Sequence, residues 1–226
     1  RILVEGFYDE VSSSNSTEKE LINRLSETVP MGFLSRFGPL PDKLKNLPVK
    51  DVIENLLFKP SINISGIKSG YMDKQVTTIL PDVAKCRVDI RFVPEQDGEL
   101  LIQRLKDHLK THGYGDIIIK VLVHLPWYRV DIDEPIVQAV LKSYNELGFH
   151  PQIWPNSGGA SIVSVIGRSL NLPIAEGGLI TGGGSHGADE FIVLRTNLEK
   201  RAGLKECERS YASILYNFPI FASGKV

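Results

Sequence analysis

The chain has 226 residues, of which 42% are hydrophobic and 23% charged, and 26 Lys and Arg residues nearly balance 27 Asp and Glu residues. A net charge of −1, with both signs interspersed, gives no indication of a nucleic-acid-binding or membrane-binding surface. No apolar run approaches the roughly 20 residues that a membrane-spanning helix needs, and no signal peptide is visible.

Two features bear on the setting of the chain. Cys86 and Cys207 lie far apart and form no Cys-x-x-Cys motif, so we expect a reducing, cytoplasmic location rather than a disulfide framework. The sequence opens at Arg1 without a methionine and runs directly into a strand-like stretch, RILVEGF. We therefore expect the 226 residues to be part of a longer protein.

The first predicted domain spans residues 1–126. RILVEGFYDEV is strand-like, and Thr17 and Glu20 have the spacing of a capping box, which predicts a short helix in TEKELINRLSE. Five prolines interrupt residues 29–60, so we expect a long connection with short helical turns there.

Residues 61–126 are the predicted strand-rich core of this domain. Leucines at helical spacing predict a helix over 98–112, which ends near Gly113. Four strand-like stretches predict a small antiparallel sheet with helices on one side. These stretches are SINISGI (61–67), QVTTIL (75–80), AKCRVDIRFV (84–93) and DIIIKVLVHL (116–125). The third alternates cleanly, and its predicted buried face comprises Ala84, Cys86, Val88, Ile90 and Phe92.

The second predicted domain, residues 127–226, has the alternating elements of part of an α/β layer. EPIVQAVLKSYNELG predicts a helix that begins near Pro135 and stops at Gly148. We also expect short strands around PQIW and in LPIAEGG, a helix over 160–170, and a long closing helix in NLEKRAGLKECERSYASILYNF.

The stretch GLITGGGSHGADEF (178–191) surrounds one histidine with glycines. Glycines let a backbone approach a ligand closely, and an imidazole there can bind zinc if an acceptor holds its second nitrogen. His186 is therefore a candidate metal ligand, with Asp189 or Glu190 as its acceptor. Two alternatives stay open: an incidental surface histidine, or a phosphate-binding loop at Gly182–Gly184, although no Gly-x-x-x-x-Gly-Lys-Ser/Thr pattern is present.

Three further features are candidates for substrate binding. Arg91, on the polar face of its strand, suits an anionic substrate group; the alternative is a surface pair with a nearby aspartate. Thr78 offers a hydroxyl from a neighbouring strand, or is an ordinary strand threonine. NSGGAS (156–161) precedes a predicted helix. The free N–H groups at the start of a helix can bind an anion. The alternative is that the stretch is a plain turn between a strand and the helix.

Four stretches, taken in order, resemble the co-catalytic zinc aminoacylase and carboxypeptidase family, which includes carnosinases, acetylornithine deacetylase, succinyl-diaminopimelate desuccinylase and glutamate carboxypeptidase. GIKSGYMDKQVTTILPDVAKCRVDIRFVPEQD is similar to the signature of the dimerisation domain of that family. RILVEGFYDEV resembles a strand early in its lid, NSGGAS its Gly-Gly-Ser element, and GGGSHGADEF its last metal-ligand motif. The order and the spacing agree over nearly the whole chain.

This resemblance implies an α/β zinc peptidase with an inserted α+β lid, or dimerisation domain, through which a homodimer forms. The implied reaction is hydrolysis of an amide bond in a dipeptide or an N-acyl amino acid that has a free carboxylate. His186 then looks like a ligand of one of two zinc ions, Arg91 like the lid arginine that grips the substrate carboxylate, and Thr78 like the lid residue that reaches into the partner's active site. The residues that match the substrate-binding turn are Gly158, Gly159 and Ser161.

The chain also departs from the family pattern. Asn156 and Ser157 stand where the carnosinase-like branch usually has Arg-Glu, and Ala160 replaces a serine. The resemblance places the His-x-Asp ligand pair, the paired glutamates with the general base, a further acidic ligand and the lid histidine upstream of Arg1. We therefore expect no catalytic residue in these 226 residues and no activity from them alone. A dimerisation or interaction module without chemistry remains the alternative function.

Overall fold

The computed structural model describes residues 2–34, 42–71, 78, 80–157, 161–185, 187–196 and 201–224. The chain divides into two compact units, of which unit 1 comprises Arg1–Trp127 with Trp154–Ser161, and unit 2 comprises Tyr128–Ile153 with Ile162–Val226. None of the described helices has the length and apolar character needed to cross a lipid bilayer.

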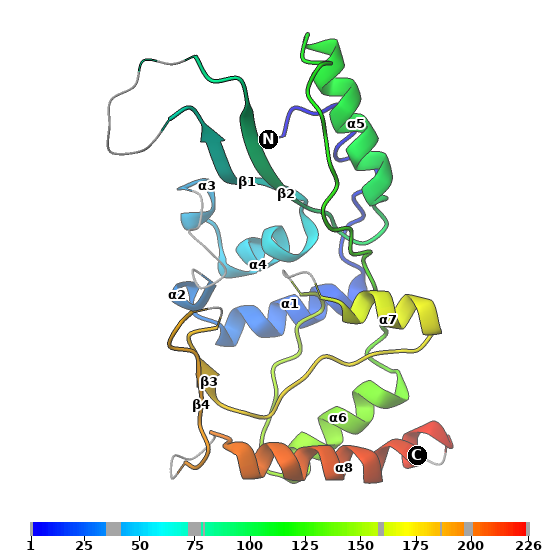
Figure 1. Ribbon diagram of the computed structural model, residues 1–226. Helices are drawn as coiled ribbons and strands as arrows, with labels where there is room; N and C mark the ends of the chain where they lie inside the picture. Colours follow the sequence, from blue (N-terminus) through cyan, green and yellow to red (C-terminus); the bar gives the residue numbers. More distant parts are fainter. Residues whose placement is uncertain are drawn as a thin grey trace. The chain divides into compact units, whose positions relative to one another are not determined.

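The elements of the two units are labelled in Figure 1. Unit 1 contains α1 (Ser16–Thr28), α2 (Met31–Leu34), α3 (Asp42–Lys45), α4 (Val49–Phe58), β1 (Ser61–Ser69), β2 (Ala84–Arg91) and α5 (Gly98–Thr111). Unit 2 contains α6 (Pro135–Glu146), α7 (Val163–Leu170), β3 (Gly182–Gly183), β4 (Phe191–Ile192) and α8 (Leu204–Ala222).

Helix α1 begins at a capping box, but not at the predicted one. The Asn15 side chain accepts a hydrogen bond from the Glu18 backbone N–H at 2.9 Å, and the Glu18 carboxylate accepts one from the Asn15 N–H at 2.7 Å. The predicted pair, Thr17 and Glu20, lies inside the helix instead. Both pairs have the same spacing, and Asn15 satisfies the free N–H groups two residues earlier, so the helix begins there.

Helices α1 and α4 share one apolar core. The proline-rich connection is more helical than predicted, because α4 has 10 residues and buries a complete face. This core is continuous with buried residues of α2 and α3, and the Trp154 side chain packs against it. The fully buried members are Leu34, Val52 and Ile53. The others are Ile22, Leu25, Val29, Leu44, Leu57 and Phe58.

Strands β1 and β2 form an antiparallel two-stranded sheet, with an irregular register between Ile64 and Gly66. The predicted buried face of β2 is covered only at one end. Ile62 and its cross-strand partner Ile90 pack against the cluster that includes Leu101 of α5, whereas Val88 is 43% exposed. The prediction was therefore wrong for Ala84, Cys86 and Val88, because α5 does not extend over that part of the sheet.

The predicted four-stranded sheet is not confirmed. Residues 4–10 form turns, and residues 117–125 lie outside any strand, with Ile118 94% exposed. Of the predicted strand at 75–80, Thr78 and Leu80 are not in a strand, and the other positions lie outside the described residues. A run of β-branched residues has a high propensity for the extended conformation. A strand forms only where a second strand pairs with its backbone N–H and C=O groups.

Helix α5 holds the N-terminal segment in place. The Arg104 guanidinium forms a bidentate pair with the Glu10 carboxylate, at 2.6 and 2.7 Å, and donates to the Gly6 carbonyl. Gly6 has φ of +72°, and a Cβ there would lie 2.7 Å from the Arg104 Nε atom. Hydrogen bonding from Arg104 lowers the pKa of the Glu10 carboxyl group. The segment is thus fixed by one side chain that is distant from it in sequence.

Unit 2 is organised by the packing of α6 against α8 (Figure 1). The Asn217 amide on α8 is buried and donates hydrogen bonds to the Ser143 hydroxyl at 3.0 Å and to the Glu146 carboxylate at 2.9 Å, both on α6. Pro135 begins α6 as predicted, and Gly148 follows its end with φ of +82°. The stretches PQIW and LPIAEGG, predicted as strands, form none, because they have no strand partner among the described residues.

Candidate functional site

The glycine-rich stretch of unit 2 forms a small hairpin. Gly182 pairs with Ile192, and Gly183 pairs with Phe191. A Cβ at position 182 would lie 2.7 Å from the Phe191 carbonyl oxygen, and one at 183 would lie 2.9 Å from the Phe191 ring. Gly182 is therefore required by the close approach of the β4 backbone, whereas the contact at 183 is with the exposed ring of Phe191, which can move aside.

Gly184 closes the same hairpin. Its φ of +71° favours glycine, and its carbonyl accepts a hydrogen bond from the Gly187 N–H at 2.8 Å. The hairpin leads into β4 and not into a helix, so its geometry does not favour the phosphate-binding alternative at Gly182–Gly184, which gains much from a helix N-terminus.

His186, the predicted metal ligand, lies outside the described residues, between Ser185 and Gly187 of this hairpin. Its predicted acceptors, Asp189 and Glu190, are exposed. Within the described ranges, no three His, Cys, Asp or Glu side chains are grouped so that they could hold a metal ion. The described side chains by themselves thus do not fit a zinc site, and we derive no catalytic step through a metal.

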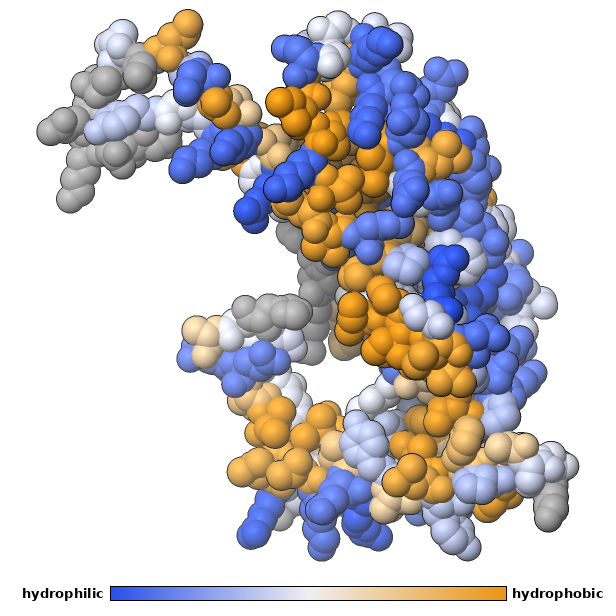
Figure 2. Space-filling model, turned by 45° about the vertical axis from the view of Figure 1, so that its right-hand side comes forward, coloured by the Kyte–Doolittle hydropathy of each residue, from blue (hydrophilic) through white to orange (hydrophobic). Residues whose placement is uncertain are grey.

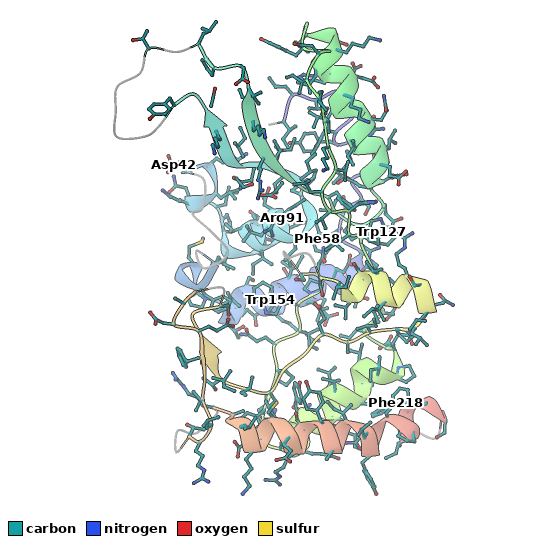
Figure 3. All side chains as sticks on the ribbon, viewed as in Figure 1. Asp42, Phe58, Arg91, Trp127, Trp154 and Phe218 are labelled. Carbon is teal, nitrogen blue, oxygen red and sulfur yellow. The ribbon has the colours of Figure 1, made fainter. Side chains whose placement is uncertain are left out.

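Arg91 is the last residue of β2, opposite Ser61 of β1, and its side chain is exposed (Figure 3). The alternative was an ion pair with Asp89 or Asp97. No such pair to Arg91 occurs among the residues that the structure describes. The guanidinium group is thus available to a ligand.

A buried glutamine, Gln96, fixes the turn that follows Arg91. Its side-chain oxygen accepts from the Val93 N–H at 3.1 Å, and its amide donates to the Phe7 carbonyl at 2.9 Å. The side chain is only 1% exposed, so these bonds replace its contacts with water. The sequence analysis missed Gln96, because a glutamine in a charged PEQD stretch gives no signal of burial.

The structure does not bring the other predicted substrate-binding residues together among the residues that it describes. Thr78 is exposed and lies outside any strand, and Ser161 is half-buried two residues before α7. Gly158 and Gly159 lie outside the described residues. In the same NSGGAS stretch, the Asn156 amide donates to the Leu57 carbonyl near the end of α4 at 2.8 Å, which ties the stretch to the helical core of unit 1.

Comparison with known proteins identifies the domain that contains Arg91. Residues 13–117 match the family model of the M20 peptidase dimerisation domain. No curated protein matches the chain closely enough to extend this comparison.

Solved structures give a wider match. An M20-family metallo-carboxypeptidase from Sulfolobus solfataricus is 28% identical with a TM-score of 0.78, over 97% of this chain and 49% of that one. Human carnosine dipeptidase 1 (16% identity, TM-score 0.69) and a dipeptidase from Saccharomyces cerevisiae (15%, 0.65) share the fold over 96% of this chain. In these two structures, 45% of the solved chain is covered.

The chain thus spans about half the length of the structures it matches. The match of residues 13–117 covers the signature stretch and most of the predicted strand-rich core. The resemblance inferred from the ordered motifs is therefore confirmed, because residues 13–117 match the M20 peptidase dimerisation domain.

Proposed function

We propose that the chain supplies the dimerisation domain, about residues 1–126, and the C-terminal part of the α/β domain, about 127–226, of a zinc-dependent amide hydrolase. The substrate is a dipeptide or an N-acyl amino acid with a free carboxylate. The observation that carries this proposal is the match of residues 13–117 to the peptidase dimerisation domain. The similarity to a metallo-carboxypeptidase over 97% of the chain supports it.

Arg91 binds the substrate carboxylate in this proposal. It stands at the end of a strand, on a backbone that the buried Gln96 holds, and its guanidinium group pairs with no carboxylate of the described residues. A guanidinium binds a carboxylate through two parallel hydrogen bonds, so its orientation also orients the amide bond to be cleaved. Thr78, Gly158, Gly159 and Ser161 complete the substrate site in the same proposal.

His186 is proposed to hold one of two zinc ions, or another divalent metal, with Asp189 or Glu190 holding its second nitrogen. A metal held there would supply an activated water and would stabilise negative charge on the amide oxygen. No group of three metal-binding side chains occurs among the described residues, and the resemblance places the general base and the other metal ligands upstream of Arg1. We therefore propose that the 226 residues alone bind the substrate carboxylate but do not hydrolyse the amide.

The proposed assembly is a cytoplasmic homodimer formed through unit 1. Apolar side chains of the β1–β2 hairpin support this, because Ile64 is 58% and Ile67 is 73% exposed on the same face as Val88. Exposed apolar clusters of this kind mark protein–protein contact surfaces. The same observation also favours the second candidate function, a dimerisation module without chemistry.

An assay of the purified chain tests both candidates. We expect no turnover of dipeptides or N-acyl amino acids with added Zn²⁺, but saturable binding of N-acetyl amino acids that Arg91→Met weakens at least tenfold. Arg87→Met, on the same strand, serves as the control. Turnover by the pure chain contradicts the proposed inactivity, and binding that does not depend on Arg91 favours the module without chemistry.

The sequence upstream of Arg1 tests whether the proposed reaction is amide hydrolysis. The coding DNA that precedes the Arg1 codon should encode a His-x-Asp motif followed by paired glutamates. An upstream coding sequence without these motifs contradicts the amide-hydrolase proposal.

A further inference from the structure

A pocket lies where the end of β1 and the residues that lead into β2 come together, away from Arg91. Its volume is about 460 Å³, and its lining comes from the end of β1 and from the residues that lead into β2. Pockets of roughly 300–1,000 Å³ accommodate small organic ligands. The side chains that give it its chemistry are Lys68, Tyr71, Leu80, Asp82, Val83 and Lys85.

Two lysines face each other across the strands at this pocket. Lys68 and Lys85 are direct cross-strand partners, which places their Cα atoms about 4.5–5.5 Å apart. Like charges directly opposite each other destabilise a strand pair. No ion pair joins either lysine to a carboxylate in the described part of the chain. An anion bound between the two ammonium groups would remove this repulsion.

The lining of the pocket also includes large apolar and aromatic side chains that are open to water. Leu80 is 92% exposed, Val83 is 50% exposed and Tyr71 is 45% exposed. Figure 2 shows hydrophilic and hydrophobic side chains together at this end of the hairpin, at the upper left. Among the described residues of the lining, Asp82 is the one carboxylate beside two lysines. A ligand with an anionic group and an apolar group would complement these side chains.

We propose that this pocket binds a small organic anion, in which a carboxylate or phosphate group is joined to an apolar group. Arg91 is not part of this pocket, whereas Thr78 of the proposed substrate site is two residues from Leu80 of the lining. Lys85 and Arg91 lie six residues apart on one strand, which corresponds to about 20 Å. A dipeptide bound to Arg91 does not span that distance, so the inference goes beyond the proposed function in that it assigns anion binding to the lysine pair and not to Arg91.

Four probes test the chemistry of the ligand by isothermal titration and by thermal shift of the purified chain. Phenylacetate and phenyl phosphate combine an anionic with an apolar group, inorganic phosphate lacks the apolar group, and benzyl alcohol lacks the charge. We expect saturable binding of one or both of the first two, at least tenfold tighter than that of the last two and weaker at high salt. The tighter of the first two identifies the anionic group as carboxylate or phosphate.

Lys85→Glu is the decisive variant, because it converts the lysine pair into an opposite-charge pair with Lys68. We expect it to keep or raise the melting temperature and to weaken anion binding at least tenfold. Lys106→Glu on the exposed face of α5 should leave binding unchanged. Lys85→Glu should weaken binding as much in an Arg91→Met background, which removes the proposed carboxylate site, as in the wild-type chain. Binding that survives Lys85→Glu, equal binding of benzyl alcohol, or no saturation by any probe at millimolar concentration would overturn the proposal.

Discussion

The helical core of α1–α4 and the β1–β2 hairpin belong to the same unit, yet they differ in how far their apolar side chains are buried. In the helical core, Ile53, Val52 and Leu34 are fully buried. In the hairpin, only the end beside α5 is covered, and Ile67 is 73% exposed at the other end. The helices thus complete a core within the chain, whereas the hairpin keeps apolar surface that suits a second molecule.

Truncation of a buried residue should show the largest difference between the two regions. Ile53→Ala removes three methylene-sized groups from a fully buried site, and we expect it to cost about 2–5 kcal/mol of unfolding free energy. Ile67→Ala on the hairpin should change it by less than about 0.5 kcal/mol. Urea denaturation of both variants measures the two values. Equal losses would show that the free end of the hairpin is covered within the chain.

The N-cap of α1 should give the second-largest change in unfolding free energy. Asn15→Ala removes the side chain that accepts from Glu18 N–H, and we expect a loss of about 1 kcal/mol. Thr17→Ala is the matched control, because Thr17 lies inside the helix, where the change should be within about 0.5 kcal/mol. If Thr17→Ala cost more than Asn15→Ala, the helix would begin at the pair first expected from the sequence.

The contact between α5 and the N-terminal segment should depend on pH. Arg104 lowers the pKa of Glu10, so the contribution of the ionised carboxylate is present above the ordinary pKa of about 4.3 and is lost as the pH falls below it. Glu10→Gln should cost about 0.5–1 kcal/mol at pH 7, a modest value because water partly screens the pair. Urea denaturation at pH 7 and at pH 3 should show this difference shrink toward zero.

The matched control for that experiment is Glu20→Gln. Glu20 pairs with Arg24 on the surface of α1, where both side chains are largely exposed. Such pairs contribute about 0.5 kcal/mol or less. A pH dependence as large for Glu20→Gln as for Glu10→Gln would mean that the Arg104 contact adds nothing beyond an ordinary surface pair.

The smallest effect on folding, and the clearest on assembly, should come from the hairpin. Ile67→Ser should leave the unfolding free energy within about 0.5 kcal/mol and raise the dissociation constant of a dimer at least tenfold, or about 1.4 kcal/mol. Asp89→Ser, on the other face of the same sheet, should change neither. Sedimentation velocity over a range of concentrations distinguishes these outcomes. A wild-type chain that stays monomeric contradicts the proposed dimer.

Local pattern predicted much of the helical structure. Leucine spacing predicted α5 to within a residue, and the Pro135 and Gly148 signals gave both ends of α6. The strand that carries Arg91 was also predicted, with Arg91 on its polar face. These signals act over a few residues, because a helix or a strand face repeats with a short period. The division into domains at residue 126 and the role of His186 stay predictions.

The errors share a different origin. The apolar run at 116–125 predicted a strand that has no partner, and the alternating face of β2 predicted burial that α5 completes at one end only. Gln96 and Arg104 were not singled out, although they hold the segment before α1 to the rest of unit 1. In each case the outcome depends on a contact, present or missing, with residues that are far away in the sequence.

The amino-acid sequence alone determined where most helices begin and end, and it contained the ordered motifs that resemble those of the zinc aminoacylase and carboxypeptidase family. The tertiary structure decided which apolar faces are covered, which polar residues are buried, and which lysines face each other. The physical reason is the distance over which each signal acts. Helix caps and periodicity join residues a few positions apart, whereas Gln96 bonds a carbonyl 89 residues away and Arg104 pairs with a carboxylate 94 residues away.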